Sequence, residues 1–172
     1  IAVRDGRAVY TRDSVLFDKV EYSWPLLIGL LWIASKRDKC LRLVDFGGGF
    51  GTSYYQNRAF LRRLHCLRWS IVEQEKFIEI GRAEFENENI SFYDNLRTCF
   101  AKDKPDAVLF SSVLQYLEKP YNILDEVKSL GIRFVILDRT GFVRGDKDIL
   151  TVQTVPPQIF DAKYPAWFFS HS

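Results

Sequence analysis

One segment of this 172-residue chain constrains its fold more than any other: an apolar run that contains an acid and then breaks into glycines. The run reads Leu43-Val44-Asp45-Phe46, and glycines occupy four of the next five positions. Glycine readily takes a positive φ and lets a backbone approach a ligand closely. The alternate glycines at 47, 49 and 51 therefore predict a strand that feeds a nucleotide-binding turn. The alternative is a tight turn between strand and helix that binds nothing.

The spacing of the glycines argues against two common nucleotide sites. The dinucleotide fingerprint needs a third glycine three positions after the second, and Thr52 stands there if the first two are Gly47 and Gly49. A P-loop ends in Gly-Lys-Ser or Gly-Lys-Thr, and neither tripeptide occurs. No tyrosine is followed by Lys at the Tyr-x-x-x-Lys spacing of short-chain reductases. A nicotinamide-dependent oxidoreductase is therefore disfavoured.

Apolar runs alternate with amphipathic stretches along most of the chain. This alternation is typical of a doubly wound α/β fold, a mostly parallel Rossmann-like sheet with helices on both faces. The predicted strands cover residues 41–46, 68–72, 90–93, 106–110, 132–137 and 149–155. The predicted helices cover residues 23–36, 52–64, 75–86, 95–101 and 119–129. Since no repeat or linker interrupts the pattern, we expect one domain over 1–172, with an N-terminal helical lid segment at 1–38 and a core at 39–172.

The charge balance does not indicate a nucleic-acid partner. The formal net charge is +2, with 27% charged residues, whereas a dedicated nucleic-acid binder carries a strong basic excess. A local basic group follows the glycine turn and is interpreted as a solvated helix face. Its members are Arg58, Arg62, Arg63, His65 and Arg68.

The cysteines and histidines indicate neither a disulfide framework nor a metal site. Cys40, Cys66 and Cys99 are scattered and form no Cys-x-x-Cys pair, which favours a reducing, cytoplasmic compartment. Only two histidines occur, too few to suggest a metal site without carboxylate help. We therefore expect no metal.

Two apolar runs and the absence of methionine bear on membranes and chain ends. The apolar run from Trp24 to Ala34 is shorter than the about 20 residues that span a bilayer, so it predicts a buried helix and no membrane span. The chain contains no Met and ends soon after the apolar run 166–169. Both features favour either a fragment of a longer chain, truncated at its C-terminal end, or a chain that is resolved only in part.

The string Asp45-x-Gly47-x-Gly49-x-Gly51 resembles the first motif of class I S-adenosylmethionine-dependent methyltransferases. The resemblance implies that these four residues bind that cofactor, at the carboxyl ends of the strands, where ligands of doubly wound sheets lie.

The acids that end the next two strands extend this resemblance. Glu73 follows the strand at 68–72. In the family, a carboxylate at this place accepts hydrogen bonds from both ribose hydroxyls of the cofactor. The alternative for Glu73 is a solvated acid that caps the next helix. Asp94 follows the strand at 90–93, where the family contacts the adenine; Asn95 and Leu96 are neighbouring candidates. The alternative for Asp94 is a helix N-cap.

Polar residues also follow the fourth and fifth predicted strands. The segment from Ser111 resembles the fourth motif of the same superfamily, which implies that Ser111 and Ser112 hold polar cofactor atoms while Gln115 and Tyr116 face the acceptor. For Tyr116 the alternative is core packing. The next strand delivers Asp138-Arg139-Thr140, in which Arg139 suits a carboxylate or phosphate, or simply pairs with Asp138 at the surface.

Across almost its whole length the chain resembles a family of bacterial methyltransferases whose substrate is unassigned. The shared sequence segments are Val-Asp-Phe-Gly-Gly-Gly, Ile-Val-Glu-Gln, Ser-Val-Leu-Gln-Tyr-Leu, Leu-Asp-Arg-Thr, Val-Gln-Thr-Val-Pro-Pro and Tyr-Pro-Ala-Trp-Phe-Phe, the last of which begins at Tyr164. The genes of such family members lie beside genes for surface polysaccharides. The resemblance therefore implies a role in polysaccharide biosynthesis and a small, sugar-derived acceptor. One departure is that the closing strands of the sheet are only partly represented after residue 149.

The implied reaction is methyl transfer from S-adenosylmethionine to an oxygen or nitrogen of the acceptor. A hydroxyl acceptor needs a base, for which Asp138 and Tyr116 are the candidates. Aromatic rings stabilise a sulfonium cation, and the candidates for that role are Phe50, Tyr54, Tyr10 and Tyr22. The competing hypothesis is a non-catalytic, methyltransferase-like binding or structural subunit.

Overall fold

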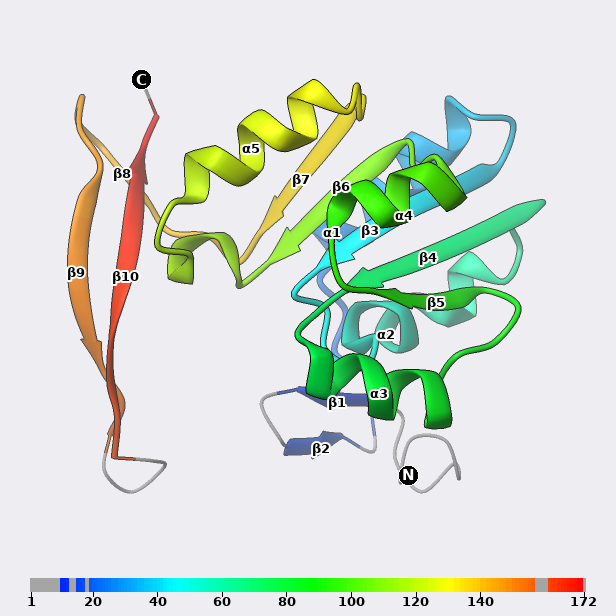
Figure 1. Cartoon of the computed structure of the whole chain (residues 1–172), viewed down its shortest axis with the longest axis horizontal. Helices are drawn as coiled ribbons and strands as arrows, with labels where there is room; N and C mark the ends of the chain where they lie inside the picture. Colours follow the sequence, from blue (N-terminus) through cyan, green and yellow to red (C-terminus); the bar gives the residue numbers. More distant parts are fainter. Residues whose placement is uncertain (1–9, 13–14, 18, 157–160, 172) are drawn as a thin grey trace.

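A computed structural model of the chain describes residues 10–12, 15–17, 19–156 and 161–171. Its centre is a five-stranded parallel sheet in the order β5-β4-β3-β6-β7 (Figure 1). The strands are β3 (Cys40–Phe46), β4 (Cys66–Val72), β5 (Ile90–Tyr93), β6 (Ala107–Ser111) and β7 (Phe134–Asp138). Five predicted strands are thus confirmed with bounds that differ by at most two residues, and so is the doubly wound α/β fold.

Helices cover both faces of this sheet, and every predicted helix is present. Figure 1 shows α4 and α5 on one side and α2 and α3 on the other. The core is divided in the same way, because residues of α1, α2 and α3 cluster against one face of the sheet and residues of α4 and α5 against the other. The helices are α1 (Trp24–Ser35), α2 (Thr52–Leu61), α3 (Glu75–Glu84), α4 (Leu96–Asp103) and α5 (Pro120–Ser129).

Helix α1 departs from the prediction of a buried helix. One face is buried through Leu26, Leu27, Leu30, Ile33 and Ala34. The opposite face exposes 56% of Trp24, 65% of Ile28 and 53% of Trp32. The helix is apolar all round, so its sequence carries no periodicity that would mark the exposed side. Among the described residues, no helix combines the length and apolarity needed to cross a bilayer.

A second, separate sheet follows the parallel one. It contains β8 (Phe142–Val143), β9 (Ile149–Thr154) and β10 (Lys163–Ser170) in the order β8-β10-β9. The strand predicted at 149–155 is therefore present, but it pairs antiparallel with β10 and not with the main sheet. The short 3-10 helix η1 (Leu114–Tyr116) packs against β10, and Trp167 donates a hydrogen bond of 3.2 Å from Nε1 to the carbonyl of Leu117. The second sheet thus extends to the loop that follows β6.

The predicted lid segment at 1–38 contains two kinds of structure within its described residues. β1 (Tyr10–Arg12) and β2 (Val15–Phe17) form an antiparallel hairpin, and α1 follows. Its role as a lid, and the division of the chain at residue 38, stay predictions.

A disulfide joins Cys40 and Cys66, so the expectation of no disulfide is wrong. The two cysteines begin adjacent parallel strands and face each other, with their Cα atoms 4.6 Å apart. A sequence separation of 26 residues hides this proximity until the pairing of β3 with β4 is known. Cys99 is buried and free. The predicted reducing compartment rested on unpaired cysteines, so it loses that support.

Candidate functional site

A cavity of about 570 Å³ opens at the carboxyl ends of the parallel strands. Seven of the predicted site residues line it: Asp45, Gly47, Gly49, Glu73, Ser111, Ser112 and Tyr116. Three others, Gly51, Asp94 and Asp138, do not belong to its lining. This is the edge of the sheet where the fold class places its ligands.

The glycine turn forms one wall of the cavity. Gly47 and Gly49 have φ angles of 68° and 57°, which residues other than glycine rarely adopt. A Cβ on Gly47 would lie 2.6 Å from Cγ2 of Val113, so this glycine allows the turn to pack on the loop after β6. A Cβ on Gly49 would meet nothing within 4 Å. The backbone of Gly49 therefore has open space beside it where it lines the cavity.

Glu73 is bound to the glycine turn. Its Oε1 accepts a hydrogen bond of 3.0 Å from the backbone N–H of Gly49, and its Oε2 accepts one of 2.9 Å from Gln74 N–H. The carboxylate at the end of β4 is thereby fixed beside the turn that follows β3. Each carboxylate oxygen can accept a further hydrogen bond, so Glu73 remains able to bind hydroxyl groups.

Asp45 lies beneath the turn and is only 1% exposed. Its Oδ2 accepts a hydrogen bond of 3.0 Å from Trp69 Nε1, whereas its Oδ1 has no partner in the described part of the chain. Burial raises the pKa of Asp45 to about 7; the hydrogen bond from Trp69 opposes this shift, and the charge of Glu73 adds to it. Among the described residues, Asp45 Oδ1 is left as an acceptor for a donor from a ligand.

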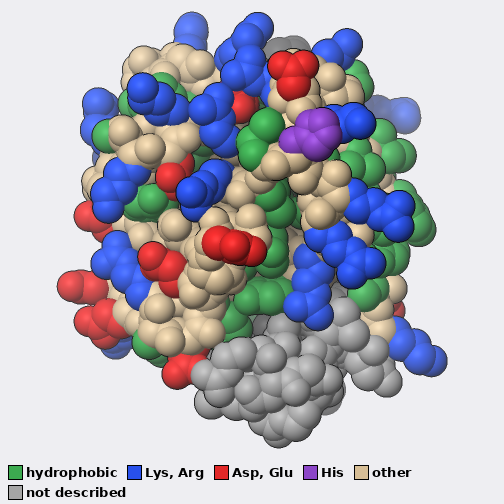
Figure 2. Space-filling model, turned by 90° about the vertical axis from the view of Figure 1, so that its right-hand side faces the viewer, with side chains coloured by type: hydrophobic (Ala, Val, Ile, Leu, Met, Phe, Trp, Pro, Cys, Tyr) green, Lys and Arg blue, Asp and Glu red, His purple; other side chains and the backbone are tan. Residues whose placement is uncertain are grey.

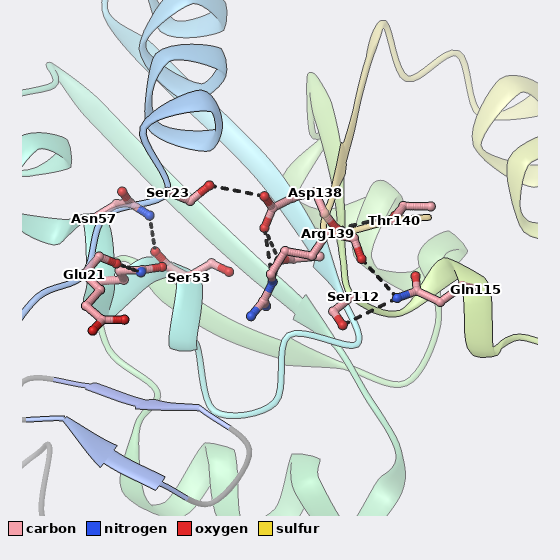
Figure 3. A network of polar contacts seen from close by, with 11 residues as sticks. Glu21, Ser23, Ser53, Asn57, Ser112, Gln115, Asp138, Arg139 and Thr140 are labelled. Atoms are coloured by element: carbon pink, nitrogen blue, oxygen red, sulfur yellow. Dashed lines mark hydrogen bonds and ion pairs between the residues drawn. The ribbon is translucent and has the colours of Figure 1, made fainter. Parts of the chain in front are cut away.

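The ends of β6 and β7 form a polar rim that Figure 3 shows in detail. Asp138 accepts hydrogen bonds at both oxygens, from Ser111 Oγ at 2.5 Å and from Ser23 Oγ at 3.3 Å. Arg139 donates from Nη2 to Ser111 Oγ at 3.0 Å, and its Nε lies 3.5 Å from Asp138 Oδ2. Because Ser111 lines the cavity and Asp138 does not, the carboxylate of Asp138 is connected to the cavity through the serine.

Two residues of this rim have left-handed backbones. Ser112 and Arg139 have φ angles of 57° and 51°. Such conformations persist where the surroundings hold them, and they are frequent at binding sites. Here Ser112 N–H donates to the carbonyl of Asp138 at 2.9 Å, and Gln115 Nε2 donates to the carbonyl of Arg139 at 3.0 Å.

The sequence missed several residues of the lining, and three of them, Gln153, Tyr164 and Phe77, contact residues that it did predict. Gln153 and Tyr164 come from β9 and β10, and they contact Tyr116. The Tyr116 hydroxyl lies 3.2 Å from Gln153 Oε1, and the rings of Tyr116 and Tyr164 meet edge to face with centroids 5.3 Å apart. Phe77, the third, packs beside the predicted Phe50 at 5.2 Å between centroids. Gln153 and Tyr164 lie in segments that carry the family resemblance, but the resemblance assigned them no role in the site.

Several predicted residues lie elsewhere. Asp94 is exposed at the end of β5, and Asn95 is the N-cap of α4, accepting a hydrogen bond of 2.8 Å from Thr98 N–H. Tyr22 packs on Trp24 and Phe60, and Tyr54 packs on Tyr55 and Trp69; neither lines the cavity. The side chain of Tyr10 lies outside the described part of the chain.

Comparison with solved structures agrees with the fold. No protein-family model and no curated protein matches the sequence. The N-terminal domain of EvdMO1, solved with SAH and D-fucose, superposes with a TM-score of 0.52 at 13% identity, over 94% of this chain and 74% of that one. DhpI, in a complex with SAM and HEP, gives 0.50 at 13% identity, over 88% and 73%. At this identity the similarity confirms the α/β fold, which this chain shares with two proteins solved with SAH or SAM.

Proposed function

We propose that this chain binds S-adenosylmethionine in the cavity and transfers a methyl group to an oxygen or nitrogen of a small acceptor. The observation that carries the proposal is the 3.0 Å hydrogen bond between Gly49 and Glu73. It joins the glycine motif to the acid of the next strand, the two features that the resemblance assigns to one cofactor. Fold neighbours solved with SAM or SAH support the same cofactor.

The residues present suit the chemical groups of this cofactor. Glu73 would accept hydrogen bonds from the ribose hydroxyls, and the open backbone at Gly49 leaves room beside it. Phe50 and Phe77 provide an apolar wall for the adenine. The buried Oδ1 of Asp45 is an acceptor without a partner, and an amino group would satisfy it. The contact between Asp94 and the adenine remains a prediction made from the sequence alone.

Bound S-adenosylmethionine supplies an activated methyl group, which leaves sulfur as its new bond to the acceptor forms. The main contribution of the chain is alignment, which lowers the barrier of such reactions by about 7 to 11 kcal/mol in favourable cases. A hydroxyl acceptor also loses a proton. Tyr116 is the candidate base within the lining, and Asp138 is the candidate that would act through Ser111.

A sugar-derived acceptor suits the far side of the cavity. Tyr116 and Tyr164 offer aromatic surface, and Gln153 offers an amide. Aromatic rings and planar amides together suit a polar ring with several hydroxyls. The D-fucose present in the EvdMO1 structure supports this class of acceptor.

Isothermal titration calorimetry with S-adenosylhomocysteine tests the cofactor. We expect saturable binding of one molecule per chain, together with a rise in melting temperature. The absence of both at millimolar ligand would overturn the proposal. Mass spectrometry of candidate sugars incubated with S-adenosylmethionine then separates a transferase from a subunit that binds without turnover.

A further inference from the structure

Arg139 is the single cationic side chain among the described residues that line the cavity. Its side chain is held in place by the 3.0 Å hydrogen bond to Ser111 and by the contact of 3.5 Å with Asp138. A guanidinium has five N–H donors, so these two contacts leave donors for a ligand. Arg139 is therefore an anchored cation with unused binding capacity at the cavity.

The charge of Arg139 acts on the glycine-turn half of the cavity. Its guanidinium is one of the groups that lower the pKa of Asp45, whose dominant shift is the rise caused by burial. Figure 3 shows the Arg139 side chain extending away from Gln115 and toward the side where Ser53 lies. Ser53 belongs to α2, directly after the glycine turn, and also lines the cavity.

A side chain that can bind an anion and an oxygen that can bind a cation therefore line the same cavity. Arg139 provides positive charge, and Asp45 provides a buried oxygen that has no protein partner. This combination fits the head group of an amino acid, which carries a carboxylate and an ammonium on one carbon. An acidic acceptor would need only the arginine and would leave Asp45 Oδ1 unsatisfied.

We propose that Arg139 binds the carboxylate of the cofactor's amino acid tail, while Asp45 accepts from the ammonium of the same tail. The inference rests on the proposed function, because it assumes that S-adenosylmethionine occupies the cavity. It makes Arg139 a cofactor-binding residue, whereas the sequence indicated either a contact with the substrate or an ion pair with Asp138 at the surface.

Two ligands that differ only in this tail test the inference. S-adenosylhomocysteine has the tail, and 5′-methylthioadenosine shares its adenosine and thioether but lacks the amino acid. Calorimetry with the full chain measures both ligands against the wild type and Arg139→Gln. We expect the variant to weaken S-adenosylhomocysteine 10- to 100-fold and to leave 5′-methylthioadenosine within twofold, as for a lost charge-assisted hydrogen bond.

Arg133→Gln is the matched control, because Arg133 is exposed just before the amino end of the same strand. It should change neither affinity. If Arg139→Gln leaves both affinities unchanged, the inference is overturned. If it weakens both ligands equally, the inference is also overturned, because the tail is then not what the arginine recognises. If the wild type binds neither ligand, the proposed function itself has failed.

Discussion

The two ends of the parallel sheet are built in opposite ways. At the amino end, Asp106 forms ion pairs with Arg37 at 2.7 Å and Arg42 at 3.1 Å, and the disulfide joins β3 to β4. At the carboxyl end, Asp45 Oδ1 and Gln115 Oε1 are buried without protein partners. Polar groups are satisfied at one end and left available at the other.

Figure 2 faces the amino end and shows many Lys and Arg side chains with few acids between them. The cavities at this end are lined by basic residues that include Lys36, Arg62 and Arg68, so its charge is distributed and solvated. Unsatisfied buried groups lower stability, and a ligand that pairs with them restores it. The comparison therefore predicts that changes at the amino end alter stability, whereas changes at the carboxyl end alter ligand binding.

Among the effects expected from removing a contact, the largest is on stability at the amino end. Replacing Cys40 and Cys66 by serine together removes the cross-link, which should lower the free energy of unfolding by about 2 to 4 kcal/mol. Denaturant unfolding with and without reductant measures this loss. The affinity for S-adenosylhomocysteine should stay within twofold, because the disulfide lies at the opposite end of the strands from the cavity. If reductant leaves the unfolding midpoint of the wild type unchanged, this part of the comparison is wrong.

The next effect is on binding at the carboxyl end. Glu73→Ala removes the carboxylate proposed to bind the ribose, so affinity for S-adenosylhomocysteine should fall by about 1.5 to 3 kcal/mol, measured by calorimetry. Glu75→Ala is the matched control, since Glu75 is an exposed acid in the first turn of α3 outside the cavity. Equal affinities in the two variants would show that Glu73 does not contribute to binding.

A third effect depends on pH. The pKa of Asp45 is raised to about 7 in the folded chain from 3.8, so the folded state binds its proton more tightly than the unfolded state does. This group therefore lowers stability progressively as pH rises from about 4 to about 7, by at most about 1.4 kcal/mol per pH unit. In Asp45→Asn the side chain does not titrate, so this loss of stability with rising pH is absent. Unfolding measured across this range should show the stability of the variant rising relative to the wild type and levelling off above pH 7; parallel curves would contradict the raised pKa.

The smallest effect concerns the contact between the cavity and the second sheet. Tyr116→Phe removes the 3.2 Å hydrogen bond to Gln153, an exposed contact that should contribute about 0.5 kcal/mol. Thermal unfolding measures the change, and S-adenosylhomocysteine should bind as before. A large loss of cofactor affinity would show that the two halves of the cavity are not independent.

The sequence predicts the cofactor half of the cavity better than the acceptor half. Parallel strands place their carboxyl ends at one edge, so the predicted strand ends alone are enough to expect Glu73 near the glycine turn. They are not enough for Gln153 and Tyr164, because the place of these two residues depends on how β9 and β10 pair and pack on η1. The same holds for the disulfide, which requires the pairing of β3 with β4.

The pairing of β3 with β4 also has a consequence for the ligand site. The strands run in step from Cys40 opposite Cys66 to Phe46 opposite Val72, so Gly47 and Glu73 follow at the same level. A slip of one residue would displace Glu73 by about 3.3 Å and break its 3.0 Å contact with Gly49. While the sulfur bond is present, no slipped alignment is available to the two strands. A covalent bond at one end of the sheet thus fixes the position of the carboxylate at the other.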